Sequence, residues 1–301
     1  MVLIAISEIF SALISNFGPR CLRRRKRIDG QVVLITGSGN GLGRLIALNF
    51  ATSGCRLVLW DIDEKGNAET KQMCEDFGAE VHVFRVDMSQ RHEIYATADR
   101  VMAEIGDVDI LINNAGMLRD PGDFLCKSDD SIEKTVQVNM LAHMWMAKAF
   151  LPRMIERKCG HIVCVCSLSA IVGARDIVDY SASKFGAFGF QEALENETYS
   201  KKRRNINFTT ICPSFTQTQM ISEISLSSAI TLLKPEIVAE EIFDAILTNK
   251  RILLLPKKAY TLYALKGLPC QTASLRRPFH ITLLSKIHHM QLKVLFLLIV
   301  S

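Results

Sequence analysis

The sequence predicts an α/β protein with one doubly wound parallel sheet and helices on both of its faces. Two observations predict this fold class. Short apolar runs rich in β-branched residues alternate with longer stretches of helical periodicity from residue 31 to residue 256. The runs are apolar throughout rather than at every second position, which is typical of parallel strands that are buried on both faces. Right-handed crossovers between such strands place the ligand site at their carboxyl ends.

The elements follow one another in regular order along the chain. The predicted strands are short apolar runs, of which the first is QVVLIT, and they cover residues 31–36, 56–61, 81–87, 109–114, 161–167, 205–212 and 251–256. The predicted helices have apolar residues at helical spacing, and they cover residues 42–51, 65–77, 91–105, 131–151, 180–199 and 235–248. In the third helix, for example, Ile94, Val101 and Ile105 are expected to face inward. No linker interrupts residues 28–256, so we expect a single domain there.

Composition and charge exclude several classes of protein. Of the 301 residues, 49% are hydrophobic and 22% are charged, which excludes a disordered, collagen-like or disulfide-scaffold protein. Residues 28–244 carry 21 basic and 30 acidic residues, whereas six basic residues lie in 20–27 and nine follow residue 244 without any acidic one. A nucleic-acid-binding protein would carry its basic charge on the folded domain, so we expect no nucleic acid as a partner.

The nine cysteines are scattered and odd in number, which indicates a reducing compartment. His161, Cys164 and Cys166 lie close together in HIVCVCS and raise the alternative of a metal site. This segment is better explained as a buried strand, in which alternate side chains face opposite sides of the sheet. Because no second cluster of ligands accompanies it, we expect no metal.

The first 27 residues are interpreted as an apolar membrane anchor with a basic flank. Residues 1–17 are mostly apolar, and FGPRCLRRRKR follows them. A secretory signal would carry its positive charge before the apolar run, whereas charge after it predicts a domain that faces the cytosol. The run is shorter than the ~20 residues of a spanning helix, so a helix lying in the membrane surface fits equally well. A disordered leader or an extra packing helix are the alternatives.

The end of the chain, residues 257–301, forms an apolar and basic extension. Residues 259–269 and 281–300 combine apolar side chains with interspersed basic ones. We interpret them as helices that face a membrane beside the substrate entrance.

A glycine-rich turn, TGSGNGLG, lies between the first strand and the first helix. Its pattern is TGxxxGxG, and the candidate cofactor-binding residues in it are Thr36, Gly37, Gly41, Leu42 and Gly43. Glycines let the backbone approach a pyrophosphate, and the start of the helix offers unpaired N–H groups and the positive end of its dipole. The alternative is a purely structural turn.

Asp61 ends the second strand, 18 residues after Gly43. A carboxylate there can accept hydrogen bonds from both hydroxyls of an adenosine ribose and would repel a 2′-phosphate, so NAD is favoured over NADP. A helix-capping aspartate is the alternative. The direction of Arg44, just after the turn, is left open by the sequence.

The candidate catalytic residues are Ser167, Tyr180 and Lys184. Tyr180 and Lys184 are four residues apart and therefore share one side of a helix. A tyrosine pKa is about 10, and a nearby ammonium group lowers it, so that the hydroxyl can exchange a proton near neutral pH. Ser167 lies 13 residues before Tyr180 and can donate to the same substrate oxygen. The alternative for YxxxK alone is an exposed helix pair.

In this order and spacing, TGSGNGLG, Asp61, NNAG (113–116), Asn139, Ser167 and YSASK (180–184) resemble the short-chain dehydrogenase/reductase family. The resemblance covers about residues 28–256 and implies a Rossmann-type fold with NAD as cofactor. It also implies further site residues, with Tyr180 and Lys184 counted among the cofactor contacts: Asp87 at the adenine, Asn114 beside the cofactor, Asn139 in a proton relay from Lys184, and Thr218 near the carboxamide. Ser214 replaces the glycine that the family usually has in this last loop.

Four longer segments resemble a narrower group, the epidermal retinol dehydrogenases and the 17-beta-hydroxysteroid dehydrogenases of types 11 and 13. They are VVLITGSGNGLGR, LVLWDID, GDVDILINNAG and AHMWMAKAFLPRMIERKCGHIV. The resemblance implies oxidation or reduction of a lipophilic alcohol or carbonyl, such as retinol or a steroid, at the endoplasmic reticulum membrane or a lipid droplet, by an enzyme that can form a homodimer. The apolar loop 214–234 is expected to cover the substrate. An NADP(H)-dependent carbonyl reductase and a membrane scaffold with low turnover are the alternatives.

Overall fold

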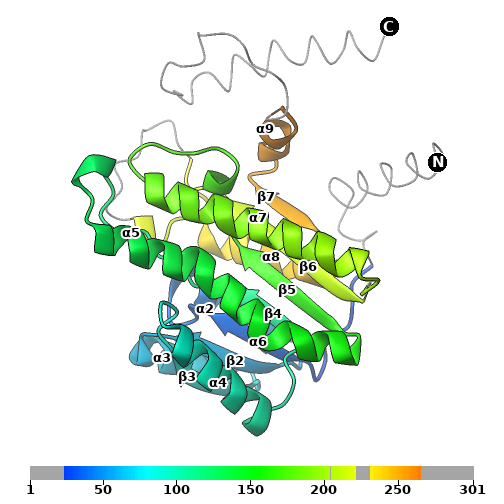
Figure 1. Ribbon diagram of the computed structural model, residues 1–301. Helices are drawn as coiled ribbons and strands as arrows, with labels where there is room; N and C mark the ends of the chain where they lie inside the picture. The colour runs from blue at the N-terminus through cyan, green and yellow to red at the C-terminus, as the bar shows by residue number, and fades with distance from the viewer. Residues whose placement is uncertain (1–23, 204, 222–230, 266–301) are drawn as a thin grey trace, which may run out of the picture.

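The computed structural model describes residues 24–203, 205–221 and 231–265, which form one layered α/β domain (Figure 1). A seven-stranded sheet has the order β3-β2-β1-β4-β5-β6-β7, and all neighbouring strands are parallel. The strands are β1 (Val32–Thr36), β2 (Arg56–Asp61), β3 (Glu80–Arg85), β4 (Ile110–Asn113), β5 (Gly160–Val165), β6 (Ile206–Pro213) and β7 (Ile252–Leu255). The strand order changes direction between β1 and β4, which is where such sheets bind their ligands. The predicted doubly wound sheet is confirmed.

Helices cover both faces of the sheet. The first face is covered by α2 (Gly41–Ala51), α3 (Glu64–Glu75) and α8 (Pro235–Leu247). The second face, toward the viewer in Figure 1, is covered by α4 (Arg91–Glu104), α6 (Ala142–Arg157) and α7 (Val178–Ser200). The described residues also form α5 (Asp129–Val136), α9 (Ala259–Leu265), the short 3₁₀ turns η2 (Phe124–Cys126), η4 (Leu168–Ala170) and η5 (Gln219–Ile221), and the π-helical turn η3 (Gln137–Leu141).

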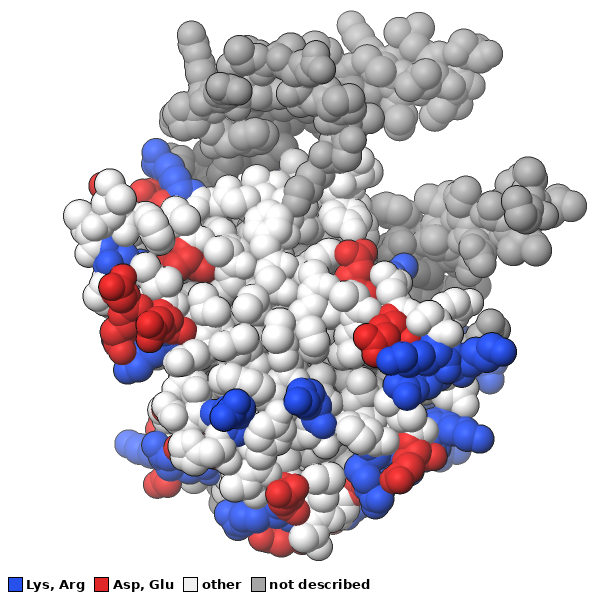
Figure 2. All heavy atoms as spheres, in the orientation of Figure 1, with Lys and Arg blue, Asp and Glu red and all other residues white. Residues whose placement is uncertain are grey.

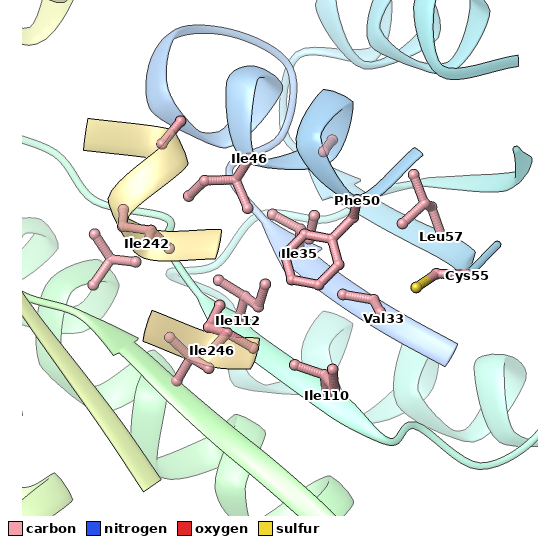
Figure 3. Packing of buried hydrophobic residues seen from close by; sticks show 14 of the residues in the cluster. Val33, Ile35, Ile46, Phe50, Cys55, Leu57, Ile110, Ile112, Ile242 and Ile246 are labelled. Carbon is pink, nitrogen blue, oxygen red and sulfur yellow. The ribbon is translucent and has the colours of Figure 1, made fainter. Parts of the chain in front are cut away.

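The core explains why the strands are apolar throughout. Val33 and Ile35 of β1 face α2 and α8, where they meet Phe50 and Ile246 (Figure 3). The residues that alternate with them in β1 face the opposite layer of helices instead. All of these side chains are fully or almost fully buried, and each contributes about 1.5–3 kcal/mol by leaving water. The strands are therefore held between two apolar layers, and their carboxyl ends are kept at fixed positions.

One predicted helix differs from the structure. The helix expected over 131–151 begins earlier and continues through Pro152 to Arg157, and a π-helical turn divides it into α5 and α6. It begins earlier because the hydroxyl of Ser128 accepts a hydrogen bond from Ser131 N and caps α5. The π turn contains Asn139, and such turns often occur at functional sites.

The beginning of the described chain packs against the amino ends of the strands. Arg25 forms an ion pair of 2.6 Å with the buried carboxylate of Asp244. Lys26 donates its backbone N–H to Leu247 O at 2.8 Å, and its Nζ lies 2.7 Å from Nδ1 of His161. These two residues belong to the segment that the sequence assigns to the basic flank of an anchor, and they contact the catalytic domain. The predicted anchor, the middle of the loop predicted to cover the substrate and most of the tail fall on residues 1–23, 222–230 and 266–301, which lie outside the described residues.

Among the described residues, no helix combines the length and the apolar character that crossing a membrane requires.

The contact of Lys26 predicts a pH dependence of stability. Burial lowers the pKa of Lys26 from 10.5 to about 8. Between these pH values the unfolded chain binds more protons than the folded chain, so the contribution of Lys26 to the free energy of unfolding rises with pH; below about pH 8 it is constant. Burial also raises the pKa of Cys55 to about 12, which acts in the opposite direction. The quantity to compare is therefore the difference in the free energy of unfolding between the wild type and Lys26→Met at each pH.

Urea unfolding of both proteins from pH 7 to pH 10.5 measures this difference. We expect it to change in favour of the wild type as pH rises through the window set by Lys26. Lys148→Met, at an exposed position of α6, is the control and should follow the wild type. A difference that stays constant with pH would contradict the prediction.

Candidate active site

A cavity of about 410 Å³ lies at the carboxyl ends of the central strands. It brings together most of the candidate residues, which are Gly37, Gly41, Leu42, Gly43, Asp61, Asp87, Asn114, Ser167, Tyr180, Lys184 and Thr218. Thr36 and Asn139 are fully buried behind this wall. The described start of the loop after β6, residues 214–221, also lines the cavity, apart from residue 217.

The glycine turn is fixed against the end of β4. The hydroxyl of Thr36 accepts hydrogen bonds from the backbone N–H groups of Asn114 and Ala115, both at 3.0 Å. Asn114 Nδ2 in turn donates to the carbonyl oxygens of Thr36 and Gly37 at 2.9 and 3.0 Å. A side chain at Gly43 would place its Cβ 1.9 Å from Gly37 O, so α2 can approach the turn only through a glycine. Through these hydrogen bonds, Thr36 holds the glycine turn against the residues that follow β4.

Asp61 holds the same turn from the side of β2. Its Oδ2 accepts from Gly39 N at 2.7 Å, and its Oδ1 accepts from Asp63 N at 2.9 Å. The aspartate that caps α3 is Asp63, so the capping alternative for Asp61 is wrong. Arg44 points toward α3, where it donates to the carbonyl oxygen of Gly39 and pairs with Glu69 at 3.1 Å. These two contacts show where the Arg44 side chain points, which the sequence alone left open.

The first turns of α7 carry Tyr180 and Lys184. Tyr180 is half-buried at the cavity wall, and Lys184 is almost fully buried. The Nζ of Lys184 donates to Val165 O at 3.1 Å and lies 5.7 Å from the centre of the Tyr180 ring. Ser167 differs slightly from its prediction, because β5 ends at Val165. Its hydroxyl accepts from Ser169 N at 3.1 Å and caps the short turn η4.

Asn139 is buried and fully bonded. Its Oδ1 accepts from Met117 N and its Nδ2 donates to Met117 O, both at 2.8 Å, and Nδ2 also donates to Ser183 Oγ at 3.1 Å. A Cβ added to Gly116 would lie 3.3 Å from Lys184 Nζ and 3.4 Å from Asn139 Oδ1. The absence of a side chain at Gly116 therefore leaves room for these two polar groups near each other. Gly116 and Ser183 belong to NNAG and YSASK, but the sequence did not reveal these contacts.

The cysteine and histidine residues near the site make separate contacts. Within the described ranges, no group of three or more His, Cys, Asp or Glu residues is arranged to hold a metal ion. His161 bonds to Thr209 Oγ1 at 2.8 Å, whereas Cys164 Sγ lies 3.3 Å from Nδ1 of His143. Burial and, to a smaller extent, the positive charge of Lys184 together lower the pKa of His143 to about 3. His143 is thus a neutral imidazole near the Lys184 ammonium group at neutral pH.

A family model described as short chain dehydrogenase matches residues 31–228. The chain belongs to the short-chain dehydrogenase family. This dehydrogenase is 45% identical over 255 residues to epidermal retinol dehydrogenase 2 of Mus musculus, which covers 83% of this chain and 82% of that protein. It is 43% identical over 256 residues to 17-beta-hydroxysteroid dehydrogenase 13 of the same species, covering 85% and 83% of the two chains.

A solved structure gives the same result for the fold. The structure of a short chain dehydrogenase/reductase from Burkholderia phymatum in complex with NAD matches the dehydrogenase with a TM-score of 0.73 and 26% identity. The match covers 80% of this chain and 94% of that one. The dehydrogenase is therefore an oxidoreductase of this family, and its similarity to both curated relatives places it in the group that the sequence motifs indicated.

Proposed function

We propose that the dehydrogenase oxidises the hydroxyl group of a lipophilic alcohol, retinol or a hydroxysteroid, with NAD as the hydride acceptor. The observation that carries the proposal is that Ser167, Tyr180 and Lys184 line the same cavity as the glycine turn and Asp61. The names of the curated relatives support the substrate class. Apolar side chains on the cavity wall suit such an alcohol, and they are those of Met117, Leu118, Leu168, Phe215, Met220 and Ile221.

The residues of the glycine turn fit a dinucleotide. Gly41 has a φ of +50°, and an added Cβ would meet only the side chain of Thr218, no closer than 3.8 Å. The turn is therefore open on its cavity side, where the first N–H groups of α2 are available to a pyrophosphate. When bound, a nicotinamide cofactor supplies the hydride chemistry. Asp61 on the cavity wall favours an unphosphorylated ribose, and Arg44 is engaged with α3.

The chain's own residues move the proton. Ser167 donates a hydrogen bond to the substrate oxygen and holds it beside Tyr180. Tyr180 in its phenolate form removes the proton of the alcohol, and the ammonium group of Lys184 stabilises that phenolate. Asn139, fixed through Met117, lies near Lys184 and directs the proton outward. In the reverse direction the same groups return a proton to the carbonyl oxygen.

We also propose a location and an assembly. The apolar residues 1–17 and the basic residues that follow them, apart from Arg25 and Lys26, support attachment to the endoplasmic reticulum membrane or a lipid droplet, with the catalytic domain in the cytosol. Figure 2 shows a broad area with few charged side chains over α6 and α7. A broad face with few charges suits contact with a second copy of the chain.

A membrane fraction from cells that express the protein tests the proposal. All-trans-retinol and a panel of hydroxysteroids are supplied with NAD or NADP, and the carbonyl product is measured beside the Tyr180→Phe variant. We expect a product that depends on both NAD and Tyr180. Turnover with NADP alone would overturn the cofactor assignment. Lack of turnover across the panel would instead favour a scaffold role.

Replacing Asp61 with Asn tests the choice of cofactor. The variant keeps the shape of the side chain but removes the negative charge that repels a 2′-phosphate and replaces one acceptor oxygen with an amide nitrogen. Loss of a backbone bond to that oxygen affects both cofactors, so the ratio of their kcat/KM values is the quantity to measure. We expect the ratio of kcat/KM for NAD to that for NADP to fall at least about tenfold, which corresponds to the loss of one hydrogen bond to a charged group. Asp63→Asn keeps a cap for α3 and should leave the ratio unchanged. An unchanged ratio in Asp61→Asn would remove this residue from cofactor selection.

A further inference from the structure

A buried ion pair lies outside the machinery described so far. Lys127 Nζ and Asp179 Oδ1 are 2.5 Å apart, and their side chains are 3% and 1% exposed. Within the described part of the chain, every other ion pair includes a side chain that is at least 31% exposed. Lys127 also donates to Arg119 O at 2.9 Å. Neither Lys127 nor Asp179 lines the cavity, and no motif of the sequence includes them.

The pair joins the segment after β4 to the first turn of α7, and both contribute residues to the cavity wall. Asp179 directly precedes Tyr180 in the first turn of α7, and Lys127 lies between η2 and α5 in the segment after β4. A second bond joins the same segments, because Gly122 N donates to Asp176 O at 2.7 Å. The segment after β4 also carries Met117, which lines the cavity and binds Asn139. The wall of the substrate cavity is thus tied to the helix of the catalytic tyrosine.

The energetics indicate that the ion pair between Lys127 and Asp179 fixes the relative position of the two segments more than it raises the free energy of unfolding. Desolvation offsets most of the Coulomb attraction of a buried pair, so apolar residues of similar size often stabilise a protein equally well. The second carboxylate oxygen of Asp179 is buried and has no hydrogen-bond partner among the described residues. A short charge-assisted hydrogen bond nevertheless defines a distance and a direction more closely than apolar contact does.

We propose that Lys127 and Asp179 are positioning residues for the reaction. Their ion pair sets the first turn of α7 against the segment after β4 and thereby sets the Tyr180 hydroxyl relative to an alcohol held in the cavity. The inference rests on the proposed function, in which Tyr180 takes the proton of that alcohol. A displacement of about 1 Å in such an arrangement lowers the rate by up to about 100-fold.

The double variant Lys127→Met/Asp179→Asn separates positioning from stability. Each single variant leaves a buried charge without its partner and should lower the Tm, whereas the double variant removes both charges and should recover most of the Tm. We expect kcat of the double variant to stay about 10- to 100-fold below that of the wild type, with the Kd for NADH within about twofold. The matched control is Lys201→Met/Glu197→Gln, an ion pair of the same 2.5 Å at the exposed end of α7.

A double variant with both Tm and kcat of the wild type would overturn the proposal. If the wild type itself oxidises no alcohol, the proposed function fails, and hydrogen exchange then tests the positioning role. We expect faster amide exchange in residues 176–184 of the double variant and unchanged exchange in the same segment of the control. Unchanged exchange in both variants would overturn the positioning role independently of any substrate.

Discussion

Replacing Tyr180 with Phe is expected to lower kcat for alcohol oxidation by about 100- to 10,000-fold. The change removes only the hydroxyl oxygen, and proton transfer by a positioned side chain contributes typically about 10²–10⁴-fold to a rate. The phenyl ring keeps its place in the first turns of α7, where the Lys184 Nζ lies 5.7 Å from the ring centre. The Kd for NADH should therefore stay within about twofold of the wild type. Steady-state kinetics and fluorescence titration with NADH measure the two quantities.

Tyr199→Phe provides the matched control for this experiment. Tyr199 lies on the same helix, is 62% exposed and is remote from the cavity wall. We expect it to have the kinetics of the wild type. If Tyr180→Phe binds NADH poorly, the tyrosine is structural; if it turns over normally, another group carries the proton.

Replacing Gly43 with Ala is expected to abolish most cofactor binding and to destabilise the fold. The new Cβ would lie 1.9 Å from Gly37 O and 2.6 Å from Asn114 Nδ2. Neither atom can move freely, because these two groups are bonded to each other and fix the turn on β4. The start of α2 must therefore shift away from the turn. We expect the free energy of unfolding to fall by about 3 kcal/mol or more, and binding of NADH to weaken at least about 100-fold.

Gly189→Ala is the control for the cost of a helical glycine. Gly189 lies in α7, and a Cβ there would meet nothing within 4 Å. In the middle of a helix the change from Gly to Ala gains about 1 kcal/mol of helix propensity, so Gly189→Ala shows the effect of replacing a helical glycine that has no close contact. Urea unfolding and NADH titration of both proteins give the result. If Gly43→Ala is as stable as Gly189→Ala and binds NADH as well, the close approach of helix and turn is not required.

The sheet and most of the candidate site could be predicted because their signals are local. A strand that is buried on both faces must be apolar throughout, and the phosphate turn needs glycines within one short segment. Tyr180 and Lys184 share a helix, so a spacing of four residues is enough to bring them together. The carboxyl ends of parallel strands meet at one edge of the sheet, and this brings the other candidate site residues together.

The remaining features depend on contacts between distant segments. The π-helical turn at Asn139 is accompanied by two hydrogen bonds between the side chain of Asn139 and the backbone of Met117, 22 residues earlier, and a helical pattern does not contain that information. Ser167 lies beyond the end of its strand because η4 begins there. The ion pair joins Lys127 in the irregular segment after β4 to Asp179 in the first turn of α7, 52 residues later. The irregular segment follows no periodicity from which this partner could be predicted.

The contact made by the basic segment has a practical consequence for shortening the chain. The apolar pattern alone places the first residue of the catalytic domain at Ile28. A chain that starts there would lack the guanidinium group that pairs with Asp244 and the backbone bond from Lys26 to Leu247 O. A chain that starts before Arg25 keeps both contacts. An affinity tag at that end would also emerge from the amino ends of the strands, about 20 Å from the cavity across the length of a six-residue strand, and would leave the cavity accessible.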